Sequence, residues 1–260
     1  MTGTESPDVT GVILTLNEAE QITACIESLR WTERVMVLDS YSQDATVELA
    51  RQAGATVHQH AFENYSTQRN VALELAATAS WVFFLDADER ATPELATEIR
   101  RVIADENDTV GWWVPRHNYI FGHRMRGAGW WPDYQLRLLR PDRACYDPER
   151  AVHEEAQLTG ESGRLMTPLI HYNYTRLAEF HTRQRAYTDY DARILLAKGV
   201  RPHVYTPYTQ ILRHFWWRFV TLEGWRDGVY GLLLSVLMAY YEMVKYRKVR
   251  RLQQERDDER

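Results

Sequence analysis

The most informative pattern in the chain is a run of large apolar residues that ends in acidic ones. Residues 81–85, Trp-Val-Phe-Phe-Leu, contain no polar position, and Asp86-Ala87-Asp88 follows them directly. A strand with one face in water would alternate, so this run predicts a strand buried on both faces, as in a parallel sheet covered by helices. Ligands of such sheets bind beyond the carboxyl ends of the strands. We therefore expect these acidic residues to belong to a binding site.

Similar strands alternate with helices through residues 9–104. Apolar runs predict strands at 9–16, 35–38 and 56–58, and apolar positions at helical spacing predict helices at 22–29, 45–53 and 68–77. Asp44 is expected to cap the second of these helices, and Thr92-Pro93 to open a further helix that ends near residue 104. This alternation predicts an α/β fold, with a mostly parallel, Rossmann-like sheet flanked by helices.

The second half of the chain is less regular. Residues 111–116 and 134–139 have the pattern of strands, and residues 175–197 have that of an amphipathic helix. The glycine- and tryptophan-rich segment 121–132 is expected to be a mobile loop near the substrate. No glycine-rich phosphate loop of the Walker or G-x-G-x-x-G type is present in the sequence.

Composition narrows the classes of protein. The net charge of −5 over 260 residues argues against general nucleic-acid binding. Cys25 and Cys145 lack a metal-ligand spacing, which fits a reducing compartment. Residues 1–8 are polar and have no apolar core, so no secretion signal is expected and the protein is predicted to be cytoplasmic.

The charge changes towards the C-terminus. Residues 211–251 contain eight Lys and Arg against three Asp and Glu, and they are rich in aromatic residues. We accordingly expect a tail at 1–8, a catalytic domain at 9–205, an aromatic and basic helical extension at 206–251 and a charged tail at 252–260. The apolar run 229–241, at thirteen residues, is short of the ~20 that span a bilayer as a helix.

This extension suits a helix that lies on an anionic membrane. Trp216, Trp217 and Trp225 precede the apolar run, and a basic cluster at 245–251 follows it. The expected location is therefore peripheral, on the cytoplasmic face of the inner membrane. A buried core or dimer helix with a solvated basic end is the alternative, and a short re-entrant or spanning helix is a second one.

Three predicted strands end in acidic residues, and these ends should meet at one edge of the sheet. The residues are Glu18, Asp39, and Asp86 with Asp88. The side chains of Asp86 and Asp88 point to the same side of an extended chain. Two adjacent carboxylates suit a hard divalent ion such as Mg²⁺ that bridges a diphosphate. The alternative is a solvated turn followed by a helix cap.

The motifs that carry these residues resemble those of a known family. Thr15-Leu16-Asn17-Glu18, Asp39-Ser40-x-Ser42-x-Asp44-x-Thr46, Gln68-Arg69-Asn70 and Asp86-Ala87-Asp88 occur in the order found in family 2 inverting glycosyltransferases of the GT-A fold. Trp131-Pro132-Asp133-Tyr134-Gln135-Leu136-Arg137-Leu138 and Val152-His153-Glu154 resemble the bacterial subgroup that contains lipopolysaccharide-core β-1,4-glucosyltransferases. The resemblance extends over residues 9–250.

The resemblance implies a nucleotide-sugar site. Asp39 matches the aspartate that accepts a hydrogen bond from the uracil imide, with Asn17 and Glu18 lining the nucleoside site. Asp88, together with Asp86, would ligate Mn²⁺ or Mg²⁺, and Asp86 is also a candidate ribose contact. The remaining candidates for donor binding are Thr15, Ser40, Arg69 and Arg137. Thr15 closing its strand, Asp39 acting as a turn residue, and Arg69 and Arg137 as surface charges are the alternatives.

An inverting transfer needs a general base for the acceptor hydroxyl. Asp133 matches the position expected for that base, and Glu154 and His153 are its rivals; the latter pair could instead contact metal or phosphate. The predicted protein is thus a glycosyltransferase that moves a hexose, expected to be glucose from a UDP donor, to a lipid-linked or lipopolysaccharide-core glycan. The alternatives are a nucleotidyltransferase-type enzyme and a non-catalytic membrane-bound scaffold.

Overall fold

The computed structural model of the chain describes residues 7–105, 108–148 and 156–258. His153 and Glu154, the rival catalytic candidates, lie outside the described residues. The chain forms two compact units, which we call the sheet unit (Met1–Arg116 and Tyr134–His171) and the helical unit (His117–Asp133 and Tyr172–Arg260). This division does not coincide with the expected boundary at residues 205 and 206.

The sheet unit contains the predicted parallel strands. They are β1 (Val9–Thr15), β2 (Arg34–Asp39), β3 (Thr56–Gln59) and β4 (Trp81–Asp86), in the order β3-β2-β1-β4. Antiparallel β8 (Tyr134–Leu139) pairs with β4 and with β6 (Thr109–Ile120). Shorter strands complete the sheets: β5 (Glu89–Arg90), β7 (His123–Arg124), β9 (Ala144–Tyr146), β10 (Ala156–Leu158), β11 (Glu161–Arg164) and β12 (Leu169–Tyr174).

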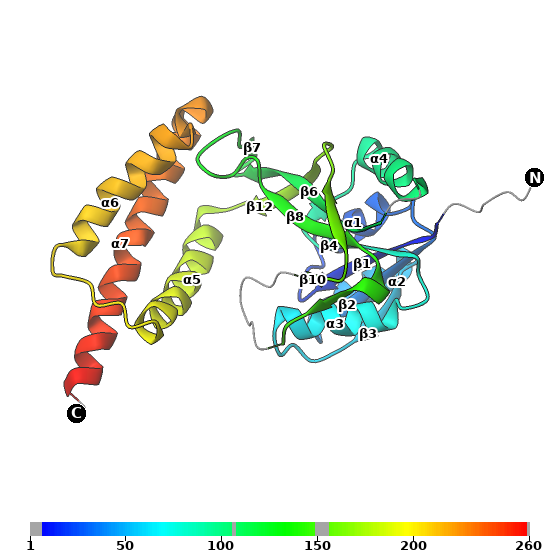
Figure 1. Cartoon of the computed structure of the whole chain (residues 1–260), viewed down its shortest axis with the longest axis horizontal. Helices are drawn as coiled ribbons and strands as arrows, with labels where there is room; N and C mark the ends of the chain where they lie inside the picture. Colours follow the sequence, from blue (N-terminus) through cyan, green and yellow to red (C-terminus); the bar gives the residue numbers. More distant parts are fainter. Residues whose placement is uncertain (1–6, 106–107, 149–155, 259–260) are drawn as a thin grey trace, which may run out of the picture. The chain divides into compact units, whose positions relative to one another are not determined.

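Helices cover both faces of the parallel strands, as the run at 81–85 predicts. Phe83 and Leu85 face α1 (Ile22–Ser28), α2 (Thr46–Gln52) and α4 (Pro93–Ala104), in one core cluster. Val82 and Phe84 pack with residues of α3 (Tyr65–Leu75) in a second cluster. Helix α3 lies on the other side of the parallel strands from α1 and α4 (Figure 1). The predicted α/β sheet flanked by helices is therefore confirmed.

Two predicted helix starts were wrong. α3 begins at Tyr65 rather than Gln68, because the side chain of Asn64 accepts a hydrogen bond from the Thr67 amide at 2.8 Å and caps the helix. α2 begins at Thr46 with Ala45 at the cap position, one residue later than predicted, and the Asp44 carboxylate accepts a hydrogen bond from the Thr46 amide at 3.0 Å. The cap of α4 was predicted correctly, since Thr92 accepts a bond from the Leu95 amide at 3.1 Å.

The helical unit consists of long helices packed on one another. They are α5 (Leu177–Ala197), α6 (Thr206–Trp216) and α7 (Gly228–Asp258). A short π-helix, η2 (Trp217–Thr221), and a short 3-10 helix, η3 (Gly224–Asp227), connect α6 to α7. The sheet unit has one short 3-10 helix of its own, η1 (Pro141–Arg143). Phe180, Leu234 and Tyr241 form its core with neighbouring aromatic residues. The helix α7 continues through most of the expected charged tail. Among the described residues, no helix combines the length and apolarity that a bilayer crossing requires.

We expect Phe83→Ala to lower the free energy of unfolding by about 3–5 kcal/mol, because this fully buried ring packs between β4 and the α1–α4 layer. Urea unfolding followed by circular dichroism measures the change. Met166→Ala, at a side chain that is 76% exposed, is the control and should stay within about 0.5 kcal/mol of the wild type. A loss below about 1 kcal/mol for Phe83→Ala would contradict the packing described here.

Candidate functional site

The candidate site lies where the strand order changes direction. From β1 the chain moves to β2 and β3 on one side, whereas β4 lies on the other side of β1. Register places Thr15 beside Asp39 and Leu14 beside Asp86. Ligands of open α/β sheets bind at such a switch point, outside the carboxyl ends of the strands. Asp39 and Asp86 thus flank the end of β1, as the sequence predicts.

The loops after β1 and β2 are joined by hydrogen bonds into one rim. The Asn17 amide donates to Ser42 Oγ at 2.7 Å, and Asn17 Oδ1 accepts from the Gln43 amide at 2.7 Å. The Glu18 amide donates to Thr46 Oγ1 at 2.8 Å. Asn17 has a φ of 56°, a left-handed conformation that asparagine tolerates. Asn17 and Glu18 therefore sit on a fixed rim of the switch point.

Asp39 is buried and is hydrogen-bonded to Ser42 of this rim. Its carboxylate accepts bonds from the Ser42 amide and hydroxyl, at 2.9 and 2.5 Å, and from Gln59 Nε2 at 3.0 Å. Ser40 Oγ accepts from Gln68 Nε2 at 2.8 Å. Thr15 is buried, and its carbonyl accepts from the Ser40 amide at 2.9 Å. Their roles in donor binding stay predictions.

Asp86, whose side chain is 38% exposed, lies at the edge of a cluster of buried charges that the sequence did not predict. Its carboxylate is 2.5 Å from one guanidinium nitrogen of Arg137, and 3.7 Å from that of Arg69. Glu89 is fully buried beside it and accepts from the same Arg137 nitrogen at 2.6 Å and from Arg116 at 3.2 Å. The second oxygen of Glu89 accepts from the Asp86 amide at 3.0 Å.

This cluster changes the interpretation of three expected donor contacts. Arg69 and Arg137 are buried, so the alternative of ordinary surface charge is wrong for both. Arg69 lies in the second turn of α3, not at its N-terminus, with its guanidinium 5.2 Å from the centre of the Phe84 ring. Burial would raise the pKa of Asp86, but the charges of Arg137 and Arg69 outweigh burial and hold that pKa well below its usual range.

Asp88 has a different partner from Asp86. His171 Nε2 lies 3.5 Å from its carboxylate, because β12 pairs with β5 and places His171 opposite Glu89. Within the described ranges, no group of three or more His, Cys, Asp and Glu side chains is arranged to hold a metal. Carboxylate oxygen and imidazole nitrogen nevertheless suit Mn²⁺, and two protein ligands leave positions for diphosphate oxygens. The residues fit such an ion if the nucleotide completes its shell.

No pattern in the sequence indicates His171. It is one histidine in a short strand, and only the pairing of β12 with β5 brings it to Asp88. Asn118 was missed for the same reason. In the helical unit, Asn118 is fully buried and donates from Nδ2 to Asp133 and to the Trp130 carbonyl, both at 2.9 Å. Asp133 is thus held by a neighbouring strand.

The structure is an α/β protein with a mixed sheet, whose parallel strands end in acidic residues at the switch point where proteins of this class bind their ligands. The model of glycosyl transferase family 2 matches residues 10–154, which is more than half of the chain. The chain therefore belongs to glycosyl transferase family 2 and is a glycosyltransferase. The predicted GT-A fold agrees with this membership and with the observed sheet.

Full-length similarity extends to curated proteins. The lipopolysaccharide core biosynthesis glycosyltransferase LpsC of Rhizobium meliloti is 28% identical over 247 residues, covering 91% of this chain and 90% of that protein. An uncharacterized glycosyltransferase, RC0292 of Rickettsia conorii, is 24% identical, covering 93% of this chain and 89% of its own. Among solved structures, glucosyl-3-phosphoglycerate synthase from Mycobacterium tuberculosis, in complex with Mn²⁺, UDP and glucosyl-3-phosphoglycerate, matches with a TM-score of 0.47 and 16% identity. The match covers 75% of this chain and 81% of that one.

The lowered pKa of Asp86 predicts an acid-dependent loss of stability. A carboxyl whose folded pKa lies below its unfolded value of about 3.9 stabilises the fold above that pH, and the contribution is lost as the pH falls towards the folded pKa. The stability difference between wild type and Asp86→Asn should therefore shrink from pH 6 to about pH 3. Urea midpoints at several pH values measure it. Asp142→Asn, at an exposed carboxylate, is the control; profiles that stay parallel for Asp86→Asn would contradict the ion pairs.

Proposed function

We propose that this glycosyltransferase transfers a hexose, with inversion, from a nucleotide sugar to a lipopolysaccharide-core or other lipid-linked glycan. The donor we propose is UDP-glucose. The observation that carries the assignment of the donor is the pairing of Asp88 with His171, next to the strand ends that hold Asp39 and Asp86. The acceptor half is supported by the full-length similarity to LpsC, whose name assigns it to lipopolysaccharide core biosynthesis.

In this proposal, Asp39 accepts a hydrogen bond from the uracil imide. A carboxylate has about four acceptor positions, and three hydrogen bonds already reach Asp39. Its side chain is fully buried, so the base would replace one of these bonds, the Ser42 hydroxyl being on the nearby rim. Asn17, Glu18 and Ser40 would line the nucleoside site from the same rim.

Asp88 and His171 would hold Mg²⁺ or Mn²⁺ against the diphosphate. The bound ion would act as a Lewis acid for the departing nucleoside diphosphate. Asp86 would keep its arginine partners and so position the end of β4 instead of serving as an equal metal ligand. Arg69 and Arg137 beneath it would contribute positive charge to the diphosphate site, at the cluster where guanidiniums outnumber carboxylates.

Asp133 would remove the proton from the acceptor hydroxyl. The bond from Asn118 Nδ2 fixes one carboxylate oxygen, and Asn173 Nδ2 approaches Asn118 Oδ1 at 3.4 Å from β12. A base must be held within hydrogen-bond reach of the proton it accepts, and this buried amide supplies that support. His153 and Glu154 remain the rival candidates.

We expect wild-type protein to bind UDP in the presence of Mn²⁺ and Asp88→Ala to lose at least tenfold in affinity, because one of two protein ligands is removed. Isothermal titration with and without Mn²⁺ measures both. Asp133→Asn should bind UDP as the wild type does but transfer no sugar from UDP-glucose to a core oligosaccharide. Unchanged UDP binding with lost transfer would distinguish the general base from the residues that bind the donor.

Asp142→Asn, which removes an exposed carboxylate of the sheet unit, is the matched control and should leave UDP binding unchanged. Failure of the wild type to bind UDP under both conditions would refute the uridine assignment. Retained transfer by Asp133→Asn would assign the base to another residue.

We also propose that the helical unit associates with a membrane surface. Val229, Leu232, Leu233, Val236 and Tyr240 are all exposed and follow helical spacing, so they form one outward apolar stripe on α7. Trp216, Trp217 and Trp225 are exposed in the same unit. Amphipathic indoles and an apolar stripe suit the boundary between head groups and acyl chains.

The basic cluster that follows the stripe supports this proposal less than expected. Lys245 pairs with Glu242 and Lys248 with Asp189, both at 2.7 Å, and Arg251 pairs with Glu255 at 2.9 Å. Their charges are thereby partly neutralised. Apolar contact would then contribute more of the membrane affinity than attraction to anionic lipids.

The double variant Val229→Glu/Val236→Glu should bind vesicles of phosphatidylethanolamine and phosphatidylglycerol about 100-fold more weakly than the wild type, because each buried valine contributes roughly 1.5 kcal/mol. Vesicle co-sedimentation measures the affinity. Met166→Glu, at an exposed apolar residue of the sheet unit, is the control. If the wild type is a dimer by light scattering and does not bind vesicles, the stripe would instead be assigned to self-association.

A further inference from the structure

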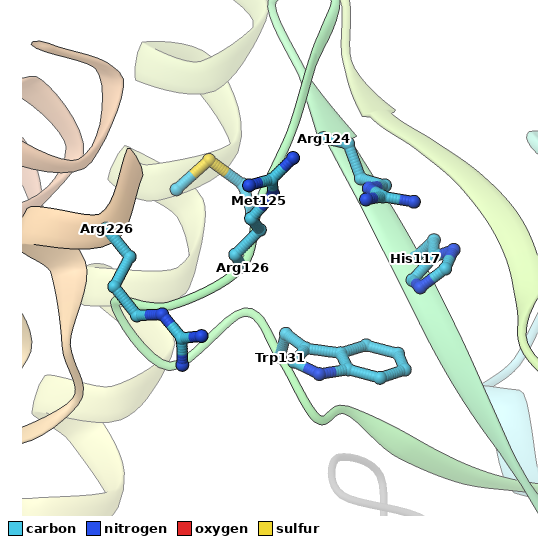
Figure 2. A pocket seen from close by; sticks show the side chains of 6 residues that line it. All are labelled: His117, Arg124, Met125, Arg126, Trp131 and Arg226. Carbon is cyan, nitrogen blue, oxygen red and sulfur yellow. The ribbon is translucent and has the colours of Figure 1, made fainter. Parts of the chain in front are cut away.

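The helical unit contains a pocket whose chemistry none of the roles above uses. It has a volume of about 240 Å³ and is lined by His117, Arg124, Met125, Arg126, Trp131 and Arg226 (Figure 2). His117 comes from β6 and Arg124 from β7, while Arg226 comes from η3. Met125, Arg126 and Trp131 lie in the segment between β7 and β8. Residues distant in the sequence thus meet around one space.

The lining is strongly basic. It contains three guanidinium groups and no carboxylate, in a protein whose net charge is −5. Arg226 pairs with Glu223 at 2.7 Å. For Arg124 and Arg126, no carboxylate of the described part of the chain forms an ion pair with the guanidinium. Guanidiniums bind carboxylates and phosphates through paired hydrogen bonds, so the pocket suits an anionic group.

The other side chains suit a sugar ring. The indole of Trp131 has His117 at 4.6 Å between ring centres, which gives the pocket an aromatic wall. Such rings bury apolar surface while keeping a polar edge, as contact with a sugar requires. Partial burial, and then the charge of Arg124, lower the pKa of His117, which favours its neutral form near pH 7. Aromatic and cationic groups therefore face one ligand-sized space.

The backbone around the pocket is fixed by Asp227. Its buried carboxylate accepts from the amides of Arg126 and Gly127, at 2.9 and 2.8 Å, and lies 3.2 Å from His123 Nε2. A Cβ on Gly127 would lie 2.4 Å from the Glu223 carbonyl oxygen, so the close approach requires glycine. The segment expected to be a mobile loop is thus hydrogen-bonded to η3. Contacts within the protein therefore hold the backbone of this lining segment.

The pocket also adjoins the proposed base within the same unit. Trp131 precedes Asp133 by two residues, which limits the distance between their Cα atoms to about 7 Å. His117 and Asn118 are neighbours in β6 whose side chains point to opposite faces of the strand, so the proximity of the pocket to Asp133 rests on Trp131. A sugar seated against Trp131 would therefore lie close to the group proposed to deprotonate it.

We propose that this pocket is an acceptor subsite that selects a sugar carrying a carboxylate or phosphate group, with the ring on Trp131 and the anion between Arg124 and Arg126. The subsite rests on the proposed function, because it assigns the acceptor of the same transfer. It narrows that acceptor from glycans in general to acidic ones. A neutral sugar would leave the guanidiniums without a counter-charge and would bind more weakly.

Saturation-transfer NMR on the full chain tests this with glucuronic acid, glucose 6-phosphate, glucose and inorganic phosphate as probes. The two sugar anions distinguish a carboxylate from a phosphate ligand. We expect at least one of them to bind about tenfold more tightly than glucose. Arg124→Gln/Arg126→Gln should lose that preference, and Trp131→Leu should weaken the sugar anion but not inorganic phosphate. The matched control is Arg193→Gln/Arg201→Gln, which removes two exposed arginines of the same unit.

UDP titration of each variant separates this proposal from the donor assignment. The subsite is supported if Arg124→Gln/Arg126→Gln loses the preference for the acidic sugar while its UDP binding is unchanged. It is also supported if the wild type prefers the acidic sugar but binds no UDP, a result that would refute the donor assignment alone. Equal binding of glucose and both sugar anions would overturn it. Weakened UDP binding in Arg124→Gln/Arg126→Gln, with sugar binding unchanged, would also overturn it by assigning these arginines to the donor.

Discussion

The pairing of Asp86 and Glu89 with arginines is the interaction on which the sheet unit depends. Arg69 comes from α3, Arg116 from β6 and Arg137 from β8, so five elements meet at two carboxylates. For the buried pair of Glu89 and Arg137, desolvating one isolated charge costs several kcal/mol, and removing one partner costs about 3–5 kcal/mol. The antiparallel strands β6 and β8 are therefore tied to the end of β4 by charge as well as by backbone bonds.

The same cluster explains why the two aspartates at the end of β4 differ. Asp86 faces guanidiniums, whereas Asp88, two residues later, faces His171. Three arginines against two carboxylates leave one excess positive charge under the strand ends. An anion beside Asp88 would lie near that charge. The cluster can thus support a diphosphate site without giving up the internal pairs of Asp86.

Local patterns could predict the elements but not the partners of the charged residues. The apolar run at 81–85 and the Thr92 cap are properties of neighbouring residues, and both were predicted correctly. The start of α3 was missed because Asn64 caps it ahead of a polar first turn with no apolar period. Asn118 and His171 act through pairings that the sequence does not show. The partner of a buried polar side chain depends on how distant strands pair, which local sequence patterns do not encode.

Strand β6 shows how much depends on that register. Arg116 reaches Glu89, His117 lines the basic pocket, and Asn118 holds Asp133. Successive side chains of a strand point to opposite faces, so a shift by one residue would exchange all three roles. The pairing of β6 with β8 changes register between Trp112 and Trp113, just before these residues. The extra residue is Arg137, which lies between Leu136 and Leu138 of β8 and has no register partner on β6, as at a β-bulge. The bulged residue is thus the one whose guanidinium pairs with both Asp86 and Glu89.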